Sequence, residues 1–109
     1  MSAFFIFTGM FYIYILYSSS ADKYYVGLTD DYLRRFEEHN NSERNTYTSK
    51  HRPWELKAVF ESGDDRGEAQ KIELFIKKQQ SRKLLEHLIQ NKPLNGAMSQ
   101  LVRVPHVRH

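Results

Sequence analysis

FYIYILYSSSADKYYVGLTDDYLRRFEEH, residues 11–39, decides the fold of this chain. Aromatic and β-branched residues fill 11–17 and resume at 24–28, and the turn-forming run SSSADK lies between them. Such residues favour strands and such runs favour turns, so we predict a β-hairpin with a six-residue loop. Thr29 is then a candidate N-cap, and YLRRFEEH predicts a helix that continues to about Asn40.

The remaining elements complete an α+β fold in the order β-β-α-β-α-α, a small sheet covered by helices. Residues 40–53 lack apolar periodicity and predict a long polar loop. Apolar residues alternate from 54 onward, which predicts a strand with one buried face, made of Trp54, Leu56, Ala58 and Phe60. Two helices follow, one from about Arg66 and one capped by Ser81, with the apolar faces Ala69, Ile72, Phe75, Ile76 and Leu84, Leu85, Leu88, Ile89.

The composition bounds the class of protein. The chain has 109 residues, enough for one domain, and a net charge of +3, which favours polyanions only mildly. It has no cysteine, which excludes disulfides, iron–sulfur clusters and thiolate zinc sites and agrees with a cytoplasmic location. We expect one domain over 10–92 and a basic tail over 93–109, because residues 91–109 carry Lys92, Arg103 and Arg108 and no carboxylate.

The apolar run AFFIFTGMFYIYILY, residues 3–17, has to be tested as a signal peptide or membrane anchor. No Lys or Arg precedes it, and its length falls short of the roughly 20 residues that a spanning helix needs. We therefore expect neither secretion nor a membrane partner. Residues 1–9 are interpreted as an N-terminal extension or a misassigned start, with Met10 as the alternative first residue.

Tyrosines crowd the hairpin, and strand alternation sorts them by face. Phe11, Ile13 and Ile15 share one face and are the better core candidates, whereas Tyr12 and Tyr14 share the other. A phenol has a donor and an acceptor to satisfy, so we expect this second face near water or a polar ligand.

Three charged or titratable side chains on the predicted helices are candidates for chemistry. Arg35 and His39 are four residues apart and project from one helix face, and Glu73 lies on a later helix. Ordinary roles are open for Glu73 and Arg35 as well. Glu73 can form an ion pair with Lys77, and Arg35 can form one with Glu38 or Asp31.

Taken together, YIY at 12–14, YVG at 25–27, Arg35 in DDYLRRFEEH and AQKIELFIKK around Glu73 resemble a GIY-YIG nuclease domain. The resemblance spans about residues 11–92 and is closest to small stand-alone bacterial members similar to the N-terminal incision domain of the excision-repair nuclease. It implies a three-stranded antiparallel sheet flanked by helices, and a metal-dependent cut in one strand of nucleic acid. By matching motif it implies the site residues Tyr14, Tyr25, Arg35, His39 and Glu73.

Two positions depart from the family pattern. Tyr12 stands where the first motif opens with glycine, and Leu28 stands where repair nucleases tend to have a lysine. The second change removes a possible cation from the neighbourhood of the tyrosines.

The residue types suit phosphodiester hydrolysis. Glu73 with several waters could hold one Mg²⁺ or Mn²⁺, and Arg35 offers a planar fork of donors to a phosphate. A phenol is a poor base at neutral pH unless a cation lowers its pKa. We assign the base role to Tyr14 over Tyr25 by a narrow margin, and His39 can polarise or relay.

Three functions stay open at this point. The first is an endonuclease acting on DNA in preference to RNA, structure-dependent or weakly sequence-specific, in DNA repair or recombination. The second is a catalytically weak or inactive module that binds nucleic acid through the basic tail and four basic side chains, namely Arg34, Lys50, His51 and Arg52. The third is a protein-interaction or structural domain; the sequence does not identify a recruiting protein partner for any of them.

Overall fold

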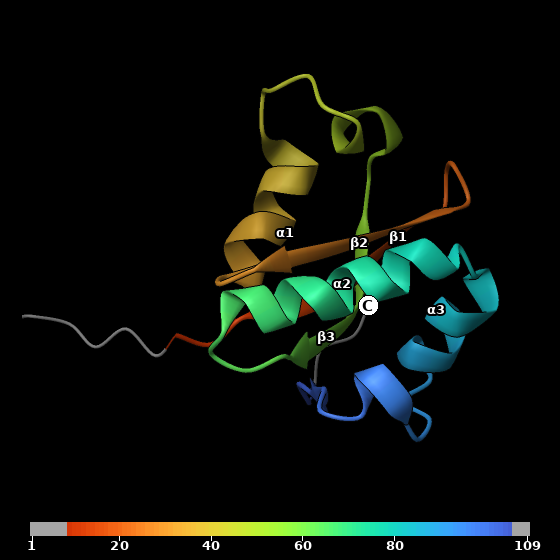
Figure 1. Ribbon diagram of the computed structural model, residues 1–109. Coiled ribbons are helices and arrows are strands. Elements are labelled where there is room, and N and C mark those ends of the chain that lie inside the picture. Colours follow the sequence, from red (N-terminus) through yellow and green to blue (C-terminus); the bar gives the residue numbers. More distant parts are fainter. Residues whose placement is uncertain (1–8, 106–109) are drawn as a thin grey trace, which may run out of the picture.

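A computed structural model describes residues 9–105, which form one antiparallel sheet with helices on both faces (Figure 1). The strands are β1 (Tyr12–Ser18), β2 (Lys23–Thr29), β3 (Glu55–Glu61) and β4 (Val102–Arg103). The helices are α1 (Tyr32–Asn41), α2 (Arg66–Gln79) and α3 (Arg82–Ile89), with short 3-10 turns η1 (Thr48–His51) and η2 (Gly96–Met98). The six longer elements follow the predicted order, and the α+β class is confirmed.

The sheet has four strands, in the order β2-β1-β3-β4, so the expected three-stranded sheet is wrong. The additional strand, β4, pairs with β3 through two residues, Val102 and Arg103. A two-residue strand has no periodicity that a sequence could display, and it therefore escaped prediction.

The segment that carries β4 packs against the rest of the fold. Met98 and Leu101 are buried in the core, and the Arg103 guanidinium donates to the carbonyl oxygens of Leu88 and Ile89 at 3.1 and 3.2 Å. Residues 93–105 are therefore held against the sheet, whereas Arg108 of the basic tail lies outside the described residues. Residues 1–8 of the N-terminal extension lie outside them as well.

Local chemistry explains the hairpin and the start of α1. Ser18 pairs with Lys23, so the hairpin loop comprises residues 19–22 and is shorter than the six residues predicted. The N-cap of α1 is Asp31, whose side chain accepts from the backbone N–H of Arg34, and not Thr29, which ends β2. The Thr29 hydroxyl instead accepts from the Asp31 N–H at 3.0 Å and fixes the turn between strand and helix.

A β-bulge corrects the predicted faces of β3. Ala58 lies opposite Ile15, but Leu56 lies opposite Leu16, so Lys57 is an extra residue on β3. Residues before and after the bulge therefore point to opposite faces. Both faces of β3 are buried, and the prediction of a single buried face is wrong.

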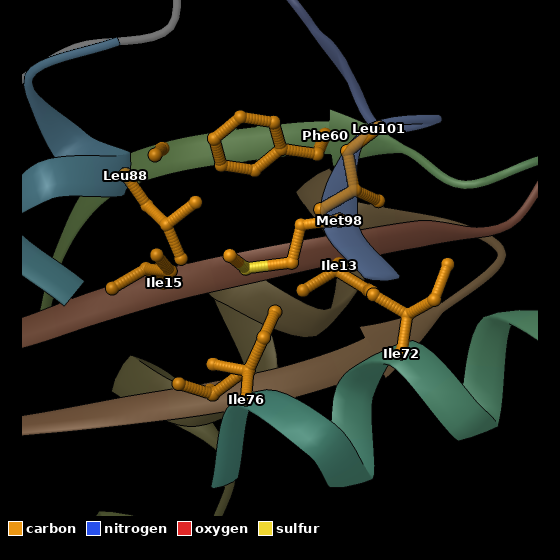
Figure 2. Close-up of a cluster of buried hydrophobic side chains, with 10 residues drawn as sticks. Ile13, Ile15, Phe60, Ile72, Ile76, Leu88, Met98 and Leu101 are labelled. Atoms are coloured by element: carbon orange, nitrogen blue, oxygen red, sulfur yellow. The ribbon is translucent and has the colours of Figure 1, made fainter. Parts of the chain in front are cut away.

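Two clusters of buried side chains lie on the two faces of the sheet. The first core cluster, between the sheet and α2, α3 and η2, contains Ile13, Ile15, Val26, Ala58, Phe60, Ile72, Ile76, Leu88, Met98 and Leu101. In Figure 2, side chains from β1, β3, α2 and α3 gather around Met98. The second core cluster, on the side of α1, contains Tyr14, Leu16, Trp54, Leu56 and Val59. Phe75, expected in the core, is 39 % exposed.

Among residues 9–105, no helix combines the length and the apolar composition needed to cross a bilayer.

Candidate active site

Tyr14 is the centre of the candidate site, and it is buried. Only 1 % of its surface is exposed, so of the two surroundings expected for this face, water or a polar ligand, the structure contradicts water for this residue. Its hydroxyl lies 2.8 Å from Nε2 of His39. The polar partner that a phenol requires is thus supplied by α1 rather than by solvent.

The phenol of Tyr14 passes over Gly27, and this close approach requires a glycine. A Cβ atom on Gly27 would lie 2.3 Å from both Cζ and Oη of Tyr14. Carbon atoms in contact are about 3.5–4.0 Å apart, so no side chain fits here while the ring keeps its position. The glycine of the second motif therefore has a packing function, which is to admit the Tyr14 ring.

Tyr25 and Arg35 line a cavity of about 310 Å³ on the outer side of this hydrogen bond. The other residues that line it are Glu38, His39, Ser42, Arg44, Thr46, Tyr47 and Thr48. The Tyr25 ring lies 5.0 Å from the His39 ring and 6.3 Å from the Tyr14 ring, between centroids. The structure thus brings together four of the five residues that the family motif implied, namely Tyr14, Tyr25, Arg35 and His39.

The two neighbouring arginines of α1 have different surroundings. Arg35 lines the cavity and forms an ion pair with Glu38 at 2.7 Å. Arg34 does not line it and forms longer ion pairs with Asp30 and Glu38, at 3.5 and 3.7 Å. Of the two, Arg35 is therefore the one positioned to meet a ligand next to Tyr25.

Burial keeps the central pair neutral. It raises the pKa of Tyr14 to about 12, assisted by Tyr25 and opposed by the Arg35 guanidinium. It also lowers the pKa of His39 to about 4, and Arg35 contributes in the same direction. At neutral pH the site therefore contains a phenol and an uncharged imidazole.

Glu73 is the fifth residue that the family motif implied. It is more buried than expected for a residue whose role is only an ion pair with Lys77 at the surface. It is 8 % exposed on α2, and Oε2 lies 3.0 Å from the Lys77 Nζ. Its charge contributes to the raised pKa of Tyr14. Tyr25 and Lys77 both line a second hollow of about 350 Å³ beside β2 and α2.

The donor set fits a hydrated Mg²⁺ better than a metal that needs a protein cage. No group of three or more His, Asp or Glu side chains within residues 9–105 could enclose an ion. Mg²⁺ keeps several waters and needs one or two carboxylates together with phosphate oxygens. Glu73 is one buried carboxylate, and one carboxylate meets that requirement.

The basic residues after α1 divide into two groups. The Arg52 guanidinium donates to the carbonyl oxygens of His39 at 2.6 Å and Ser42 at 2.7 Å. Arg52, expected as a nucleic-acid contact, thus holds the C-terminal end of α1 in place. Lys50 is exposed and His51 packs beside Tyr47, and nucleic-acid contact stays a prediction for these two.

Sequence reasoning missed Thr48, because it lies in the segment predicted as a polar loop. That segment contains η1, and its Thr48 hydroxyl lies 3.0 Å from Nδ1 of His39. The indole N–H of Trp54 donates to the Thr48 carbonyl at 2.7 Å and anchors the turn. A side chain that meets its partner through tertiary packing has no spacing signal in the sequence.

Leu28, which stands where repair nucleases tend to have a lysine, packs against the first core cluster. Tyr14 belongs to the second core cluster. The change at this position therefore affects the opposite side of the sheet, and Arg35 is a cation that acts on Tyr14.

Comparisons with known proteins found a matching family and similar chains. Residues 10–86 match the family model described as the GIY-YIG catalytic domain. The chain is similar to the UPF0213 protein lmo0166 of Listeria monocytogenes serovar 1/2a, with 39 % identity over 82 residues, covering 74 % of this chain and 88 % of that protein. It is also similar to the UPF0213 protein LMOf2365_0181 of Listeria monocytogenes serotype 4b, with 38 % identity over 82 residues, covering 74 % and 89 %.

Proposed function

Because this chain belongs to the GIY-YIG catalytic domain family, a family of nucleases, we propose that it is a divalent-metal-dependent endonuclease that hydrolyses phosphodiester bonds in DNA. The observation that carries the proposal is the buried hydrogen bond between Tyr14 and His39 beside the cavity that Arg35 lines. Glu73 on α2 completes the set of residues with a carboxylate.

Arg35 binds the scissile phosphate in this proposal. Its guanidinium lines the cavity, is partly exposed, and is held by one exposed carboxylate, Glu38. A planar fork of N–H donors matches two phosphate oxygens, and such donors are most valuable where negative charge develops in the transition state.

Tyr14 gives its hydroxyl proton to His39 and takes a proton from the attacking water. The hydroxyl and Nε2 are at hydrogen-bond distance, and the imidazole is uncharged at neutral pH, so it has a lone pair for this proton. Arg35 stabilises the phenolate side of the exchange. Tyr25 packs its ring beside His39 and borders the cavity, where it contacts substrate.

Glu73 would hold Mg²⁺ or Mn²⁺ through its carboxylate. When bound, the ion supplies charge neutralisation on the phosphoryl oxygens and assistance to the leaving alkoxide. The ion must first displace the Lys77 ammonium, which lies 3.0 Å from Oε2 of Glu73.

This ion pair favours a second candidate function, a module of the same fold that binds nucleic acid without cutting it. If Lys77 retains Glu73, no ion is bound, and the cavity with Arg35 and Arg44 serves as a phosphate site.

A nicking assay on supercoiled plasmid with Mg²⁺ or Mn²⁺ separates the two functions. We expect relaxed circles to accumulate, and we expect no product in EDTA. The same assay over single-stranded, duplex, flapped and branched DNA, and over RNA of the same sequences, identifies the substrate. Binding with salt dependence but without nicking on all these substrates would refute the nuclease and leave the module.

Preference among DNA sequences should be low. The site is built into the sheet, and the residues that border the cavity are suited to phosphate and sugar, so backbone contacts dominate. A preference for branched or flapped structures fits a role in DNA repair or recombination.

A further inference from the structure

The hydrogen bonds around His39 form a line of four side chains that runs from the buried Tyr14 to an exposed threonine. The Tyr14 hydroxyl meets Nε2 of His39 at 2.8 Å, and Nδ1 of His39 meets the Thr48 hydroxyl at 3.0 Å. The Thr48 hydroxyl lies 3.2 Å from the Thr46 hydroxyl. Tyr14, His39 and Thr48 are buried, and Thr46 is exposed at the cavity.

Satisfying every proton in this line requires one direction of donation. The Tyr14 hydroxyl is buried and needs an acceptor, and Arg35, which is also close to it, has only donors. Among the described residues, His39 Nε2 is therefore the acceptor. An uncharged imidazole with a lone pair on Nε2 carries its proton on Nδ1, and that proton is donated to Thr48.

We propose that Thr48 is a positioning residue that holds His39 as the Nδ1–H tautomer, and that Thr48 and Thr46 conduct the Tyr14 proton to the cavity. The tautomer is a property of the free protein. The catalytic use of the route rests on the proposed nuclease function.

The transfer balances without leaving a charge on His39. The Oη–H bond of Tyr14 breaks as an Nε2–H bond forms, and the Nδ1–H bond breaks as a new O–H bond forms on Thr48. The original Thr48 proton passes to Thr46, and the original Thr46 proton passes to water or a buffer base in the cavity. The phenolate that remains accepts hydrogen bonds from Nε2–H and from Arg35.

The charges around His39 favour transfer of the proton through the ring over a ring that stays protonated. The charged groups that act on the ring are Arg35 and Glu38 of α1 and Arg52 beyond η1, and two of these three are cations. Tyr14 of β1 and Tyr25 of β2 are the titratable groups that pack against the ring. A further positive charge on the imidazole is therefore unfavourable, and a path that returns the ring to neutrality removes that charge.

The backbone around Thr48 is held firmly enough to set this geometry. The Trp54 indole binds the Thr48 carbonyl at 2.7 Å. The Asn40 side chain exchanges two hydrogen bonds with the Trp54 backbone, at 2.7 and 3.0 Å. Thr48 is thus connected to α1 through Trp54, independently of the contact with His39.

The test is the tautomer of His39 in the free protein, read from the two ring nitrogens in long-range ¹H–¹⁵N spectra at neutral pH. His39 is assigned by the signal missing in a His39→Gln variant, and the other histidines are internal references. We expect a pyrrole-type Nδ1 and a pyridine-type Nε2. A wild-type spectrum with the proton on Nε2 would overturn the proposal by itself.

Two matched variants test the part of Thr48. Thr48→Val keeps the shape and removes the hydroxyl, so we expect loss of the pure Nδ1–H pattern; Thr48→Ser should keep it. An unchanged tautomer in a folded Thr48→Val protein would overturn the assignment of Thr48. Should Thr48→Val not fold, the wild-type and Thr48→Ser spectra still decide the tautomer.

Cleavage assays then test the route. We expect nicking to fall by about 10²-fold in Thr48→Val, the scale of one lost proton transfer, and to stay within a few-fold of wild type in Thr48→Ser. Equal rates in both variants would refute conduction through Thr48. Wild-type protein with the expected tautomer and no nicking on any substrate would instead refute the nuclease function and leave the tautomer assignment standing.

Discussion

Gly27→Ala tests whether the Tyr14 ring is placed by its passage over Gly27. The added Cβ would lie 2.3 Å from Cζ and Oη of Tyr14 and 2.7 Å from Cε2. Ordinary contacts are about 3.5–4.0 Å, so the ring must move by about 1 Å. Overpacking of this kind costs about 1–3 kcal/mol. A ring displaced by that amount also loses its bond to His39, which leaves a buried phenol unsatisfied at about 1–3 kcal/mol.

The two contributions, less the roughly 0.4–1 kcal/mol that Gly→Ala gains by restricting the unfolded chain, leave a destabilisation of about 1–5 kcal/mol. For a domain of this size, each kcal/mol of destabilisation lowers Tm by roughly 4–8 °C. Urea unfolding followed by tryptophan fluorescence measures it, since Trp54 lies in the same core cluster as Tyr14. Gly67→Ala is the matched control, because its Cβ would meet only the Asp65 Oδ1 at 3.3 Å in the first turn of α2.

A double mutant isolates the clash from other effects of the alanine. Tyr14→Leu ends the side chain short of the atoms that the new Cβ would strike, so in that background Gly27→Ala should cost less than about 1 kcal/mol. If Gly27→Ala is as stable as wild type, or costs the same with and without the Tyr14 ring, the close approach does not explain the glycine.

Three further predictions concern the charged and titratable residues. Glu73→Gln should leave Tm within a few degrees and retain DNA binding, since the side chain of its partner Lys77 is 43 % exposed, while metal-dependent nicking is lost. Wild-type nicking in this variant would remove the metal site from the mechanism. Arg35→Lys keeps the charge but loses the fork, so we expect cleavage to fall by roughly one to three orders of magnitude, whereas Arg34→Ala should weaken binding modestly and spare the rate of cutting. The pKa of His39 is about 4 in the folded state and 6.5 for an unperturbed histidine, so the unfolded chain takes up the proton first as the pH falls. The stability that is present above pH 6.5 is therefore lost as the pH falls toward 4, by up to about 3 kcal/mol. Urea midpoints at pH 7 and pH 4.5 measure this loss, and a folded His39→Gln variant that shows the same loss would assign it to another group.

The long elements were predictable because their signals are local. The alternation of β1, the N-cap at Ser81 and the apolar stripe of α3 each appear within one stretch of sequence. The bulge at Lys57 was not predictable, because it arises from the register between β1 and β3. One extra residue exchanges the two faces of a strand, so Trp54 and Phe60 were assigned to one face although they lie on opposite sides.

The family motif located the site residues but did not describe their surroundings. Tyr14 was expected near water or a polar ligand because a phenol has a donor and an acceptor to satisfy. Strand alternation correctly sets Tyr14 on the face opposite Ile13, but the structure buries that face. The face is covered by α1, as Phe36 and Tyr32 pack against the second core cluster. Whether a helix covers a sheet face depends on the path of the whole chain, so this burial had no counterpart in the hairpin itself.

The charges of the site are paired within the protein, and the strengths of these pairs order the proposed events. The side chains of Arg35 and Glu38 are 35 % and 43 % exposed, so their ion pair contributes only about 0.2–1 kcal/mol. Hydrogen bonds to charged groups contribute about 1.5–3 kcal/mol, so a phosphate can take Arg35 from Glu38. The Glu73 side chain is 11 % exposed and keeps Lys77 more firmly. A phosphate entering the cavity therefore engages Arg35 first, and Glu73 becomes available when a cation of higher charge displaces the ammonium. Binding without added metal should consequently depend on Arg35, and cutting should depend on both residues.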